Sequence, residues 1–485
     1  MSIALRCNLN NPARTLLHPW RHCVGSGHAA LALRADWQAQ LRMAHDELGF
    51  SHVRFHGLLD DDMGTVVCQN DELLYSFFNA DQIVDFLVSI GMRPIVELSF
   101  MPLALASGDD TVFHYKGNIT PPRDMAQWQE LMRKLAAHWV ARYGIEEVAQ
   151  WYFEVWNEPN LPAFWTGTQE QYFALYATTV KAIKGVDARL RVGGPATANN
   201  AWIPDFQQYC SAHDVPVDFI STHLYPTDAF GEIDADTITQ LEHAPLDTMR
   251  THALTARDQA AGKPLLYTEW NITSNPRDPL HDSAAGAALA VRIVMSVDDV
   301  VDAYSYWTFS DIFEENYFPS VPFHGGFGLI NLHGIRKPTF HAFAMVAKLG
   351  AGHVVIEQDH PNVVVWAGAL DAASGASHVL AINQAMPRHA IDTKTLALRV
   401  DAPAGMRAQA VTIERIDAEH ANPVALWQSW GAPDYLSSAQ VDTLHEASTL
   451  VSEDLPFTLD DAMIVLTATL APQSVNLLRI DWIAA

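Results

Sequence analysis

Two glutamates in this chain each belong to a run of β-forming residues. Glu158 follows the run at 150–156 (QWYFEVW), and Glu269 lies within the run at 265–270 (LLYTEW). If both runs are strands of one closed parallel barrel, both carboxyl groups lie at its C-terminal mouth and can flank a ligand from two sides. Hydrolysis of a glycosidic bond needs such a pair, because one carboxyl group protonates the leaving oxygen while the other attacks the anomeric carbon.

Two further side chains could assist a catalytic pair of carboxyl groups. Arg54 lies in the run at 52–56 (HVRFH), and we expect its charge to keep Glu269 ionised while Glu158, farther away, stays protonated. Tyr225 follows another such run, and its hydroxyl could donate a hydrogen bond to the nucleophile. The plainer interpretation makes each glutamate a buried carboxylate in a structural ion pair. Two glutamates at one mouth favour the catalytic interpretation.

Asn157 and Trp307 could contact a sugar directly. Asn157 precedes Glu158, so its amide could reach a 2-hydroxyl, a contact that strengthens in the transition state of glycoside hydrolysis. Trp307 lies near the end of a β-rich run, and its ring could form a flat apolar floor under a pyranose. Core packing would explain Trp307 as well in isolation, but its place at a strand end favours the sugar contact.

From about residue 20 to residue 349, β-rich runs alternate with segments in which apolar residues recur at spacings of three and four. This alternation is typical of parallel βαβ units. Eight strand and helix pairs fit a closed (β/α)8 barrel better than an open sheet. The predicted strands are 22–27, 52–56, 93–98, 150–156, 191–195, 218–223, 265–270 and 303–309, and the predicted helices include 36–48, 80–90, 125–143, 169–183, 284–297 and 339–348.

After residue 350 the pattern changes to β-runs with a period of two, such as NVVVWAGAL (362–370) and MIVLTATL (463–470). Because no helical segment of comparable strength lies among them, we predict an antiparallel β-sandwich. The predicted domains are a catalytic barrel at 16–349 and a β-sandwich at 350–485, which a strand within residues 1–15 could join.

The composition excludes several classes of function. No apolar run approaches the roughly 18 residues that cross a bilayer, so no membrane partner is predicted. The 56 acidic residues outnumber the 30 Lys and Arg residues, which argues against nucleic acid as a partner. The four cysteines show no CxxC pair and the first twenty residues show no signal-peptide pattern, so a cytoplasmic location is expected. The oligomeric state stays open, and a homo-oligomer is compatible with the sequence.

No cofactor and no metal is predicted. The segment GSGHAA (25–30) fits the loose dinucleotide fingerprint, but it falls on the first barrel strand and no open-sheet order follows it. The 22 histidines show neither an HExxH motif nor a tight ligand set. We interpret His223 as a partner for a sugar hydroxyl rather than as a metal ligand.

Several segments, taken in order, resemble the clan A glycoside hydrolases and, more narrowly, family 39. They are RFHG (54–57), WNEPN (156–160) and TEWN (268–271), supported by HCVGSGHA (22–29), VGGPAT (192–197), STHLYP (221–226) and HGGFGLIN (324–331). The resemblance covers nearly the whole chain, and the ordered set is more specific than WNEP alone. It implies a retaining mechanism in which Glu158 is the acid/base and Glu269 is the nucleophile.

The resemblance also implies a set of sugar contacts, which are His56, Asn157, Phe164, His223, Tyr225, Trp307 and the adjacent pair Glu314 and Glu315. Spacing alone does not support the last pair, because adjacent acids on a loop are more often solvated surface charge. Family 39 includes β-xylosidases and α-L-iduronidases. The acidic loop at Glu314 and Glu315 would repel the carboxylate of an iduronide. We therefore predict release of β-linked xylose from the non-reducing end of xylo-oligosaccharides.

Three alternatives stay open at this point. The chain could be an α-L-iduronidase, an endo-acting polysaccharide hydrolase of the same family, or a carbohydrate-binding barrel without activity. The presence of both carboxylates counts against the binding barrel, because a protein that only binds sugar would be free to lose either one. Activity on a panel of aryl glycosides would separate the two enzymes from a β-xylosidase.

Overall fold

The computed structural model describes residues 2–228, 236–315, 317–319, 321–461 and 463–485. Its larger part is a closed barrel of eight parallel strands, and the pairing of Tyr306 with Val24 closes the ring. The predicted (β/α)8 barrel is therefore confirmed. In barrel order the strands are β3 (Cys23–His28), β4 (His52–His56), β7 (Arg93–Glu97), β10 (Tyr152–Glu154), β11 (Arg191–Thr197), β12 (Phe219–His223), β13 (Leu265–Trp270) and β14 (Ala303–Tyr306).

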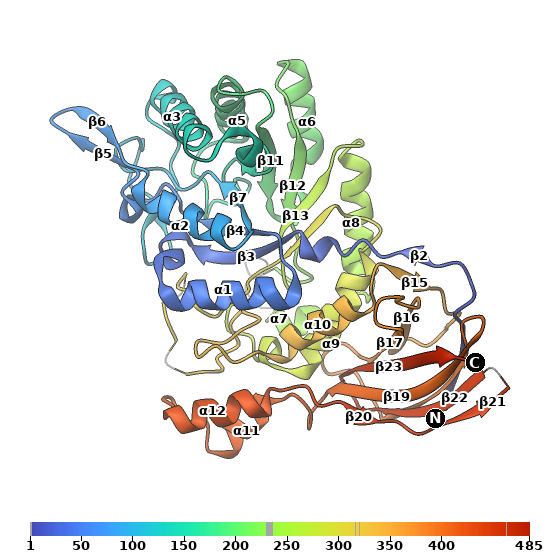
Figure 1. Ribbon diagram of the computed structural model, residues 1–485. Helices are drawn as coiled ribbons and strands as arrows, with labels where there is room; N and C mark the ends of the chain where they lie inside the picture. The colour runs from blue at the N-terminus through green and yellow to red at the C-terminus, as the bar shows by residue number, and fades with distance from the viewer. Residues whose placement is uncertain (1, 229–235, 316, 320, 462) are drawn as a thin grey trace.

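Helices surround the barrel because each buries an apolar face against the strands (Figure 1). In α3, for example, Trp128, Leu135 and Trp139 are buried, and Asp124 caps the first turn. Each predicted helix begins and ends within two residues of an observed one. The helices are α1 (Ala35–Leu48), α2 (Phe78–Ser89), α3 (Met125–Tyr143), α4 (Ile145–Val148), α5 (Gln169–Lys184), α6 (Ile203–Ala212), α7 (Thr237–His243), α8 (Thr248–Gln259), α9 (Ala284–Ser296) and α10 (Pro338–Lys348).

Two small hairpins interrupt the loops after β4 and β7. The first joins β5 (Val66–Gln69) to β6 (Glu72–Tyr75), and it projects from the barrel in Figure 1. The second joins β8 (Thr111–Val112) to β9 (Gly117–Asn118). The second hairpin matters for the site, because the residues between its strands reach the barrel mouth.

Two sheets beside the barrel enclose a second apolar core. The four-stranded sheet has the order β1 (Ser2–Asn8), β18 (Lys394–Asp401), β22 (Met463–Leu470) and β21 (Phe457–Asp460). The seven-stranded sheet has the order β2 (Arg14–Thr15), β15 (Gly352–Val354), β16 (Val363–Gly368), β17 (Ala376–Asn383), β23 (Ser474–Ala484), β19 (Met406–Ile416) and β20 (Glu453–Asp454). The N-terminal strand β1 pairs in parallel with β18, with Ser2 opposite Thr395.

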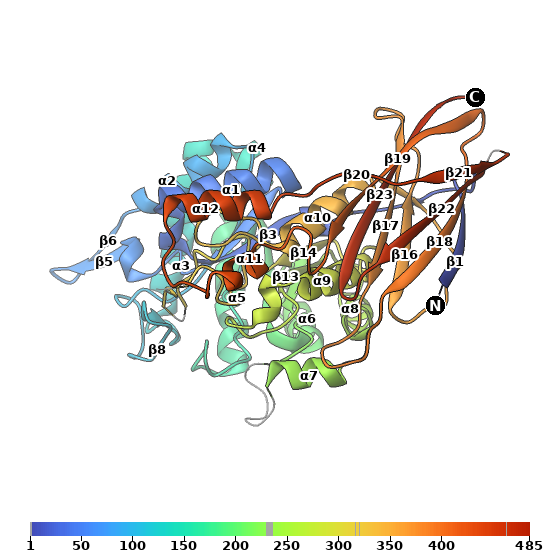
Figure 2. The same ribbon diagram turned by 90° about the horizontal axis from the view of Figure 1, so that it is seen from below.

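Two helices, α11 (Pro423–Ser429) and α12 (Ser438–Ala447), correct the expectation of strands alone after residue 350. Asn422 caps α11, and Ser437 begins α12 with a capping box. Both helices are short, and their apolar side chains are stabilised by packing rather than by a long periodic pattern. Trp427 and Leu444 pack with Phe323 and Ile335, so both helices lie against the barrel, away from the two sheets (Figure 2).

Candidate active site

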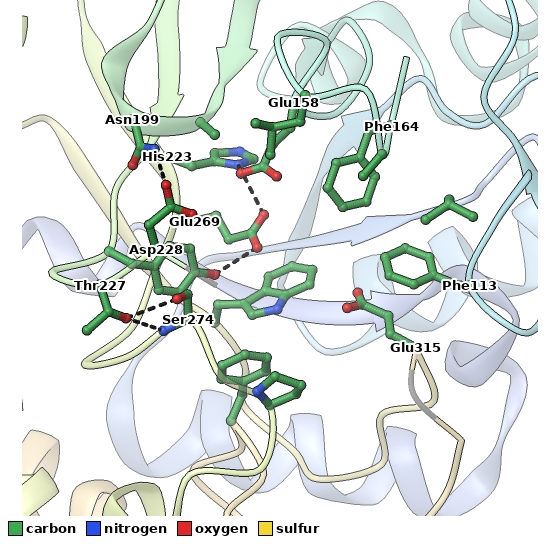
Figure 3. A pocket seen from close by; sticks show the side chains of 18 residues that line it. Phe113, Glu158, Phe164, Asn199, His223, Thr227, Asp228, Glu269, Ser274 and Glu315 are labelled. Atoms are coloured by element: carbon green, nitrogen blue, oxygen red, sulfur yellow. Dashed lines mark hydrogen bonds and ion pairs between the residues drawn. The ribbon is translucent and has the colours of Figure 1, made fainter. Parts of the chain in front are cut away.

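The C-terminal ends of the barrel strands open into a cavity of about 410 Å³. One side carries apolar side chains such as Phe113 and Phe164, and the opposite side carries polar ones such as Asn199 and Asp228 (Figure 3). The full lining is Val112, Phe113, Glu158, Leu161, Ala163, Phe164, Ala198, Asn199, His223, Tyr225, Thr227, Asp228, Glu269, Ser274, Pro276, Trp307, Glu315 and Phe327.

Glu158 and Glu269 are next to each other in this cavity. A carboxylate oxygen of Glu158 lies within 4.8 Å of one of Glu269. Retaining glycosidases hold their carboxyl groups about 5 to 5.5 Å apart, whereas inverting enzymes leave about 6.5 to 9.5 Å for a water molecule. The backbone of Glu158 is in the left-handed region, with φ of 44°, and its N–H donates to the Ala196 carbonyl at 2.8 Å. The upper limit of 4.8 Å fits double displacement and lies below the separation that inverting enzymes use.

The pKa values of the two carboxyl groups are held apart in the predicted order. Burial, followed by the charge of Glu269, raises the pKa of Glu158 well above its ordinary value. Burial also raises the pKa of Glu269, but the charges of Arg54 and His56 and a hydrogen bond from Tyr225 limit the rise to about 7. At neutral pH the pair therefore has a protonated Glu158 and a Glu269 that can ionise.

Arg54 is fully buried and contacts three carboxylates. Its Nε lies 2.5 Å from Glu154 Oε2, and its other nitrogens lie 2.8 Å from Glu97 Oε2 and 3.2 Å from Glu269 Oε2. It also donates to Asn157 Oδ1 at 2.9 Å. The predicted pairing of Arg54 with Glu269 is present, but it is the longest of the three ion pairs.

Glu97 and Glu154 were not predicted as site residues from the sequence, and both are fully buried. Glu154 also accepts from the Thr268 hydroxyl at 2.7 Å, and Glu97 accepts from the Ser99 hydroxyl. Both glutamates lie inside strands that were predicted to be barrel core. A carboxylate in an otherwise apolar strand was the available signal, since a buried charge must find a partner.

His223 lines the cavity, and its Nδ1 lies next to both carboxyl groups, while its contact with a sugar hydroxyl stays a prediction. Its Nδ1 is 2.9 Å from Glu158 Oε1 and 3.2 Å from Glu269 Oε2. Burial, with the nearby charges of Arg54 and His56, lowers the pKa of His223 well below its ordinary value, so the ring is neutral. A neutral ring has one N–H, and the hydrogen bond at Nδ1 joins His223 to Glu158, with Glu269 close by at 3.2 Å.

Tyr225 hydrogen-bonds to Glu269, whereas Asn157 hydrogen-bonds to Arg54. The Tyr225 hydroxyl donates to Glu269 Oε1 at 2.8 Å, which is the hydrogen bond expected from the sequence. Asn157 Oδ1 is occupied by Arg54, which fixes the amide beside Glu158. Its contact with a sugar 2-hydroxyl stays a prediction.

Trp307 lines the cavity, whereas His56 packs against the Trp307 ring and is not among the described lining residues. The two rings are 4.7 Å apart between centroids, and Trp307 lines the cavity although it is almost fully buried. Gly25 lies against the Trp307 ring, where a Cβ atom would overlap it. Burial opposes protonation of His56, but Glu97 and Glu315 raise its pKa to about 10, so a buried positive charge lies behind the Trp307 ring.

The structure separates the adjacent acids Glu314 and Glu315. Glu315 lines the cavity and lies 3.4 Å from His56 Nε2. Glu314 turns away and pairs with His28 Nδ1 at 2.8 Å. Phe164 lines the apolar wall beside Phe113, which the sequence analysis missed because Phe113 lies in a long loop without periodicity.

Two groups of described residues have atoms spaced so that they could hold a metal ion. They are His28 with Asp60 and Asp62, and His223 with Glu158 and Glu269. In the second group, Glu158 is already hydrogen-bonded to His223, and Glu269 is already hydrogen-bonded to Tyr225. The first group lies outside the cavity lining.

Comparison with protein families shows which family this fold belongs to. Residues 3–461 match the family model for glycosyl hydrolases family 39. The chain belongs to this family. It is therefore a glycoside hydrolase, and the resemblance drawn from its motifs is confirmed.

Two characterised relatives of this family 39 chain match it over most of their length. A β-xylosidase of Caldicellulosiruptor saccharolyticus is 47% identical over 90% of this chain and 89% of its own. A β-xylosidase of Geobacillus stearothermophilus is 38% identical over 95% of this chain and 92% of its own.

Solved structures of the family share the whole architecture. A GH39 enzyme from Xanthomonas axonopodis pv. citri has 33% identity and a TM-score of 0.87, covering 99% of this chain and 98% of its own. A monomeric β-xylosidase from Caulobacter crescentus has 32% identity and a TM-score of 0.86, covering 99% of both chains. Within the described residues, the family 39 chain has no helix that is long and apolar enough to span a membrane.

Proposed function

We propose that this protein is a retaining β-xylosidase that releases β-linked xylose from the non-reducing ends of xylo-oligosaccharides. The observation that carries the proposal is the adjacent pair of Glu158 and Glu269, which has the close spacing that double displacement uses. A cavity of about 410 Å³ has the size of a small-ligand site, which supports removal of a terminal sugar.

In the first step, Glu158 donates its proton to the glycosidic oxygen while Glu269 attacks the anomeric carbon. The bond to the leaving oxygen breaks, the shortened chain departs as an alcohol, and xylose stays on Glu269 as an ester. Tyr225 and Arg54 hold the attacking carboxylate through hydrogen bonds at 2.8 and 3.2 Å. The hydrogen bond from the neutral His223 keeps Glu158 beside the leaving oxygen.

In the second step, Glu158 takes a proton from water, and that water attacks the anomeric carbon and frees Glu269. The charge of Glu269 is one reason why the pKa of Glu158 is raised. Formation of the ester removes that charge, so the pKa of Glu158 falls when Glu158 must act as a base. One pair of carboxyl groups can thus supply both an acid and a base.

The preference for a neutral pentose is supported by the charges of the cavity wall. The 18 described lining residues include four acids, Glu158, Asp228, Glu269 and Glu315, but no Lys or Arg. A uronic acid would bring its carboxylate to this wall without a cation to pair with. Of the two acids on the loop after β14, only Glu315 belongs to this wall, because Glu314 pairs with His28 and lies outside the lining.

The experiment is to replace Glu269 by Ala and to measure turnover of an aryl β-xyloside with and without azide. We expect a loss of about 10⁴-fold or more, and partial recovery with azide that yields the xylosyl azide of inverted configuration. The exposed Glu170, replaced by Ala, is the matched control and should leave turnover unchanged. If Glu269→Ala turned over the substrate nearly as fast as the unaltered enzyme, the assignment of Glu269 as the nucleophile would be wrong. If the unaltered enzyme hydrolysed a uronide or a polymer but no xyloside, the proposal that it releases xylose would be wrong.

A further inference from the structure

His28 ends β3 and is surrounded by three carboxylates outside the catalytic pair. Its Nδ1 lies 2.8 Å from Glu314 Oε1, and its Nε2 lies 3.3 Å from both Asp60 Oδ2 and Asp62 Oδ1. The Tyr115 ring stacks on the imidazole, with centroids 3.9 Å apart and planes 4° from parallel. The His28 side chain is fully buried, and the mechanism proposed above makes no use of it.

These contacts join the loops of four neighbouring barrel strands. His28 belongs to β3, Asp60 and Asp62 to the loop after β4, Tyr115 to the loop after β7, and Glu314 to the loop after β14. In the barrel these strands are consecutive, in the order β14, β3, β4 and β7. Asp60 also accepts from the backbone N–H of Phe100 at 3.0 Å, so the same carboxylate fixes the start of the loop after β7.

The charge balance around the ring favours an imidazolium. A neutral imidazole has one N–H and can donate on one side only, whereas a protonated ring donates from both nitrogens. The titratable groups that face the ring are Asp60, Asp62, Glu314 and the Tyr115 phenol. Burial lowers the pKa of His28, but the three carboxylates outweigh burial and raise it to about 11. The ring therefore stays charged at neutral pH.

Two of the residues held in this way are next to the cavity wall in sequence or in space. Glu314 adjoins Glu315, which lines the cavity. Tyr115 lies 5.3 Å from Phe113 between ring centroids, and Phe113 lines the same side. Figure 3 shows both Phe113 and Glu315 on the side of the cavity away from Asn199 and Asp228.

We propose that His28 is a positioning residue whose positive charge fastens Glu315 and Phe113 into the wall that receives the sugar. It acts through Glu314 and Tyr115 and does not itself touch the substrate. The choice of sugar in the experiment rests on the proposed β-xylosidase function.

A divalent metal ion is the competing occupant of this place. His28 Nε2, Asp60 Oδ2 and Asp62 Oδ1 have ligand spacing, and Glu314 could orient the ring of a metal-binding histidine through Nδ1. A metal ion and a proton exclude each other at Nε2. Metal analysis of the purified enzyme therefore separates the two: a stoichiometric ion at His28 would overturn the proposal.

The main experiment compares His28→Arg with His28→Gln on an aryl β-xyloside. Arg keeps the positive charge and Gln removes it. For His28→Gln we expect KM to rise about 10- to 100-fold with kcat changed far less, because a displaced wall weakens binding of the sugar in the ground state and the transition state alike. For His28→Arg we expect KM to stay within a few-fold of the unaltered enzyme. A fold defect alone would instead lower the active fraction and leave KM unchanged.

Two milder variants keep the test decisive if His28→Gln does not fold. Glu314→Gln removes the charge that links His28 to the cavity wall, and it should raise KM in the same way. Asp71→Asn is the matched control, since Asp71 is exposed in the turn between β5 and β6 and belongs neither to the carboxylates around His28 nor to the cavity lining, so it should leave KM nearly unchanged. Equal KM values for His28→Gln and the unaltered enzyme, or for His28→Arg and His28→Gln, would refute the role of the charge. If the unaltered enzyme hydrolyses a different glycoside, the β-xylosidase proposal fails, and the same comparison is made on that substrate.

Discussion

Arg54 is held more closely by Glu154 than by the carboxylate it serves. The Arg54 Nε to Glu154 Oε2 distance is 2.5 Å, whereas Arg54 reaches Glu269 at 3.2 Å. Glu154 therefore takes part of the positive charge that would otherwise lower the pKa of Glu269. Burial, followed by the charge of Glu315, is what keeps the pKa of Glu269 at about 7 next to an arginine.

The first prediction is that Glu154→Gln extends activity to lower pH. Glu269 must be ionised to attack, so kcat/KM falls as pH drops through its pKa. Neutralising Glu154 leaves Arg54 more available to Glu269 and removes a nearby negative charge, and both effects lower the pKa of Glu269. We expect the acid limb of the kcat/KM profile to move down by about one pH unit.

The matched control is Thr268→Val, which removes the hydroxyl that donates to Glu154 but leaves its charge. Its acid limb should stay within a few tenths of a unit of the unaltered enzyme, in contrast to Glu154→Gln. An acid limb that stays in place or moves upward in Glu154→Gln would show that Glu154 does not compete for Arg54.

Tyr225→Phe should move the same limb in the opposite direction. The Tyr225 hydroxyl donates to Glu269 Oε1 at 2.8 Å and lowers the pKa of that carboxyl group. Without this hydrogen bond the carboxylate is less stable, and the acid limb of kcat/KM should rise by about half a unit to one unit. A downward shift in the pH profile of this variant would contradict the assignment of that limb to Glu269.

Glu158→Gln tests the acid by its dependence on the leaving group. A general acid contributes about 10²- to 10⁴-fold when the leaving group needs a proton. We expect kcat/KM to fall by that factor for xylobiose and to change little for a dinitrophenyl β-xyloside, whose leaving group needs no proton. The basic limb of the pH profile should disappear with the carboxyl group. Equal losses on both substrates would argue against Glu158 as the acid.

The barrel and the catalytic pair could be predicted because their signals are local. Each predicted barrel strand lies within three residues of an observed one, and the mouth of a parallel barrel places Glu158 and Glu269 in one cavity. The same reasoning brought Arg54 and Tyr225 to Glu269, since both follow from strand ends that converge.

The remaining features depend on contacts that sequence patterns do not contain. Glu97 and Glu154 become partners of Arg54 only when the barrel closes around them. His223 was correctly placed at a strand end, but its contact with both carboxyl groups depends on side-chain direction. Helices α11 and α12 were missed because their apolar residues pack against Phe323 and Ile335, which are about 90 to 120 residues earlier in the chain.

The last prediction concerns stability and a buried lysine. Lys337 is fully buried and lies 2.6 Å from Asp282 Oδ1 and 2.7 Å from Asp311 Oδ2, and it donates to the Gly326 carbonyl at 2.9 Å. In Lys337→Met both carboxylates lose their counterion inside the protein. Removing one partner of a buried ion pair costs about 3 to 5 kcal/mol, so the free energy of unfolding measured with denaturant should fall by that amount.

Lys348→Met is the control, because the Lys348 side chain is 40% exposed and pairs with Glu414. Its free energy of unfolding should fall by less than about 1 kcal/mol. Similar losses in the two variants would mean that the buried aspartates are protonated or hydrated when Lys337 is removed.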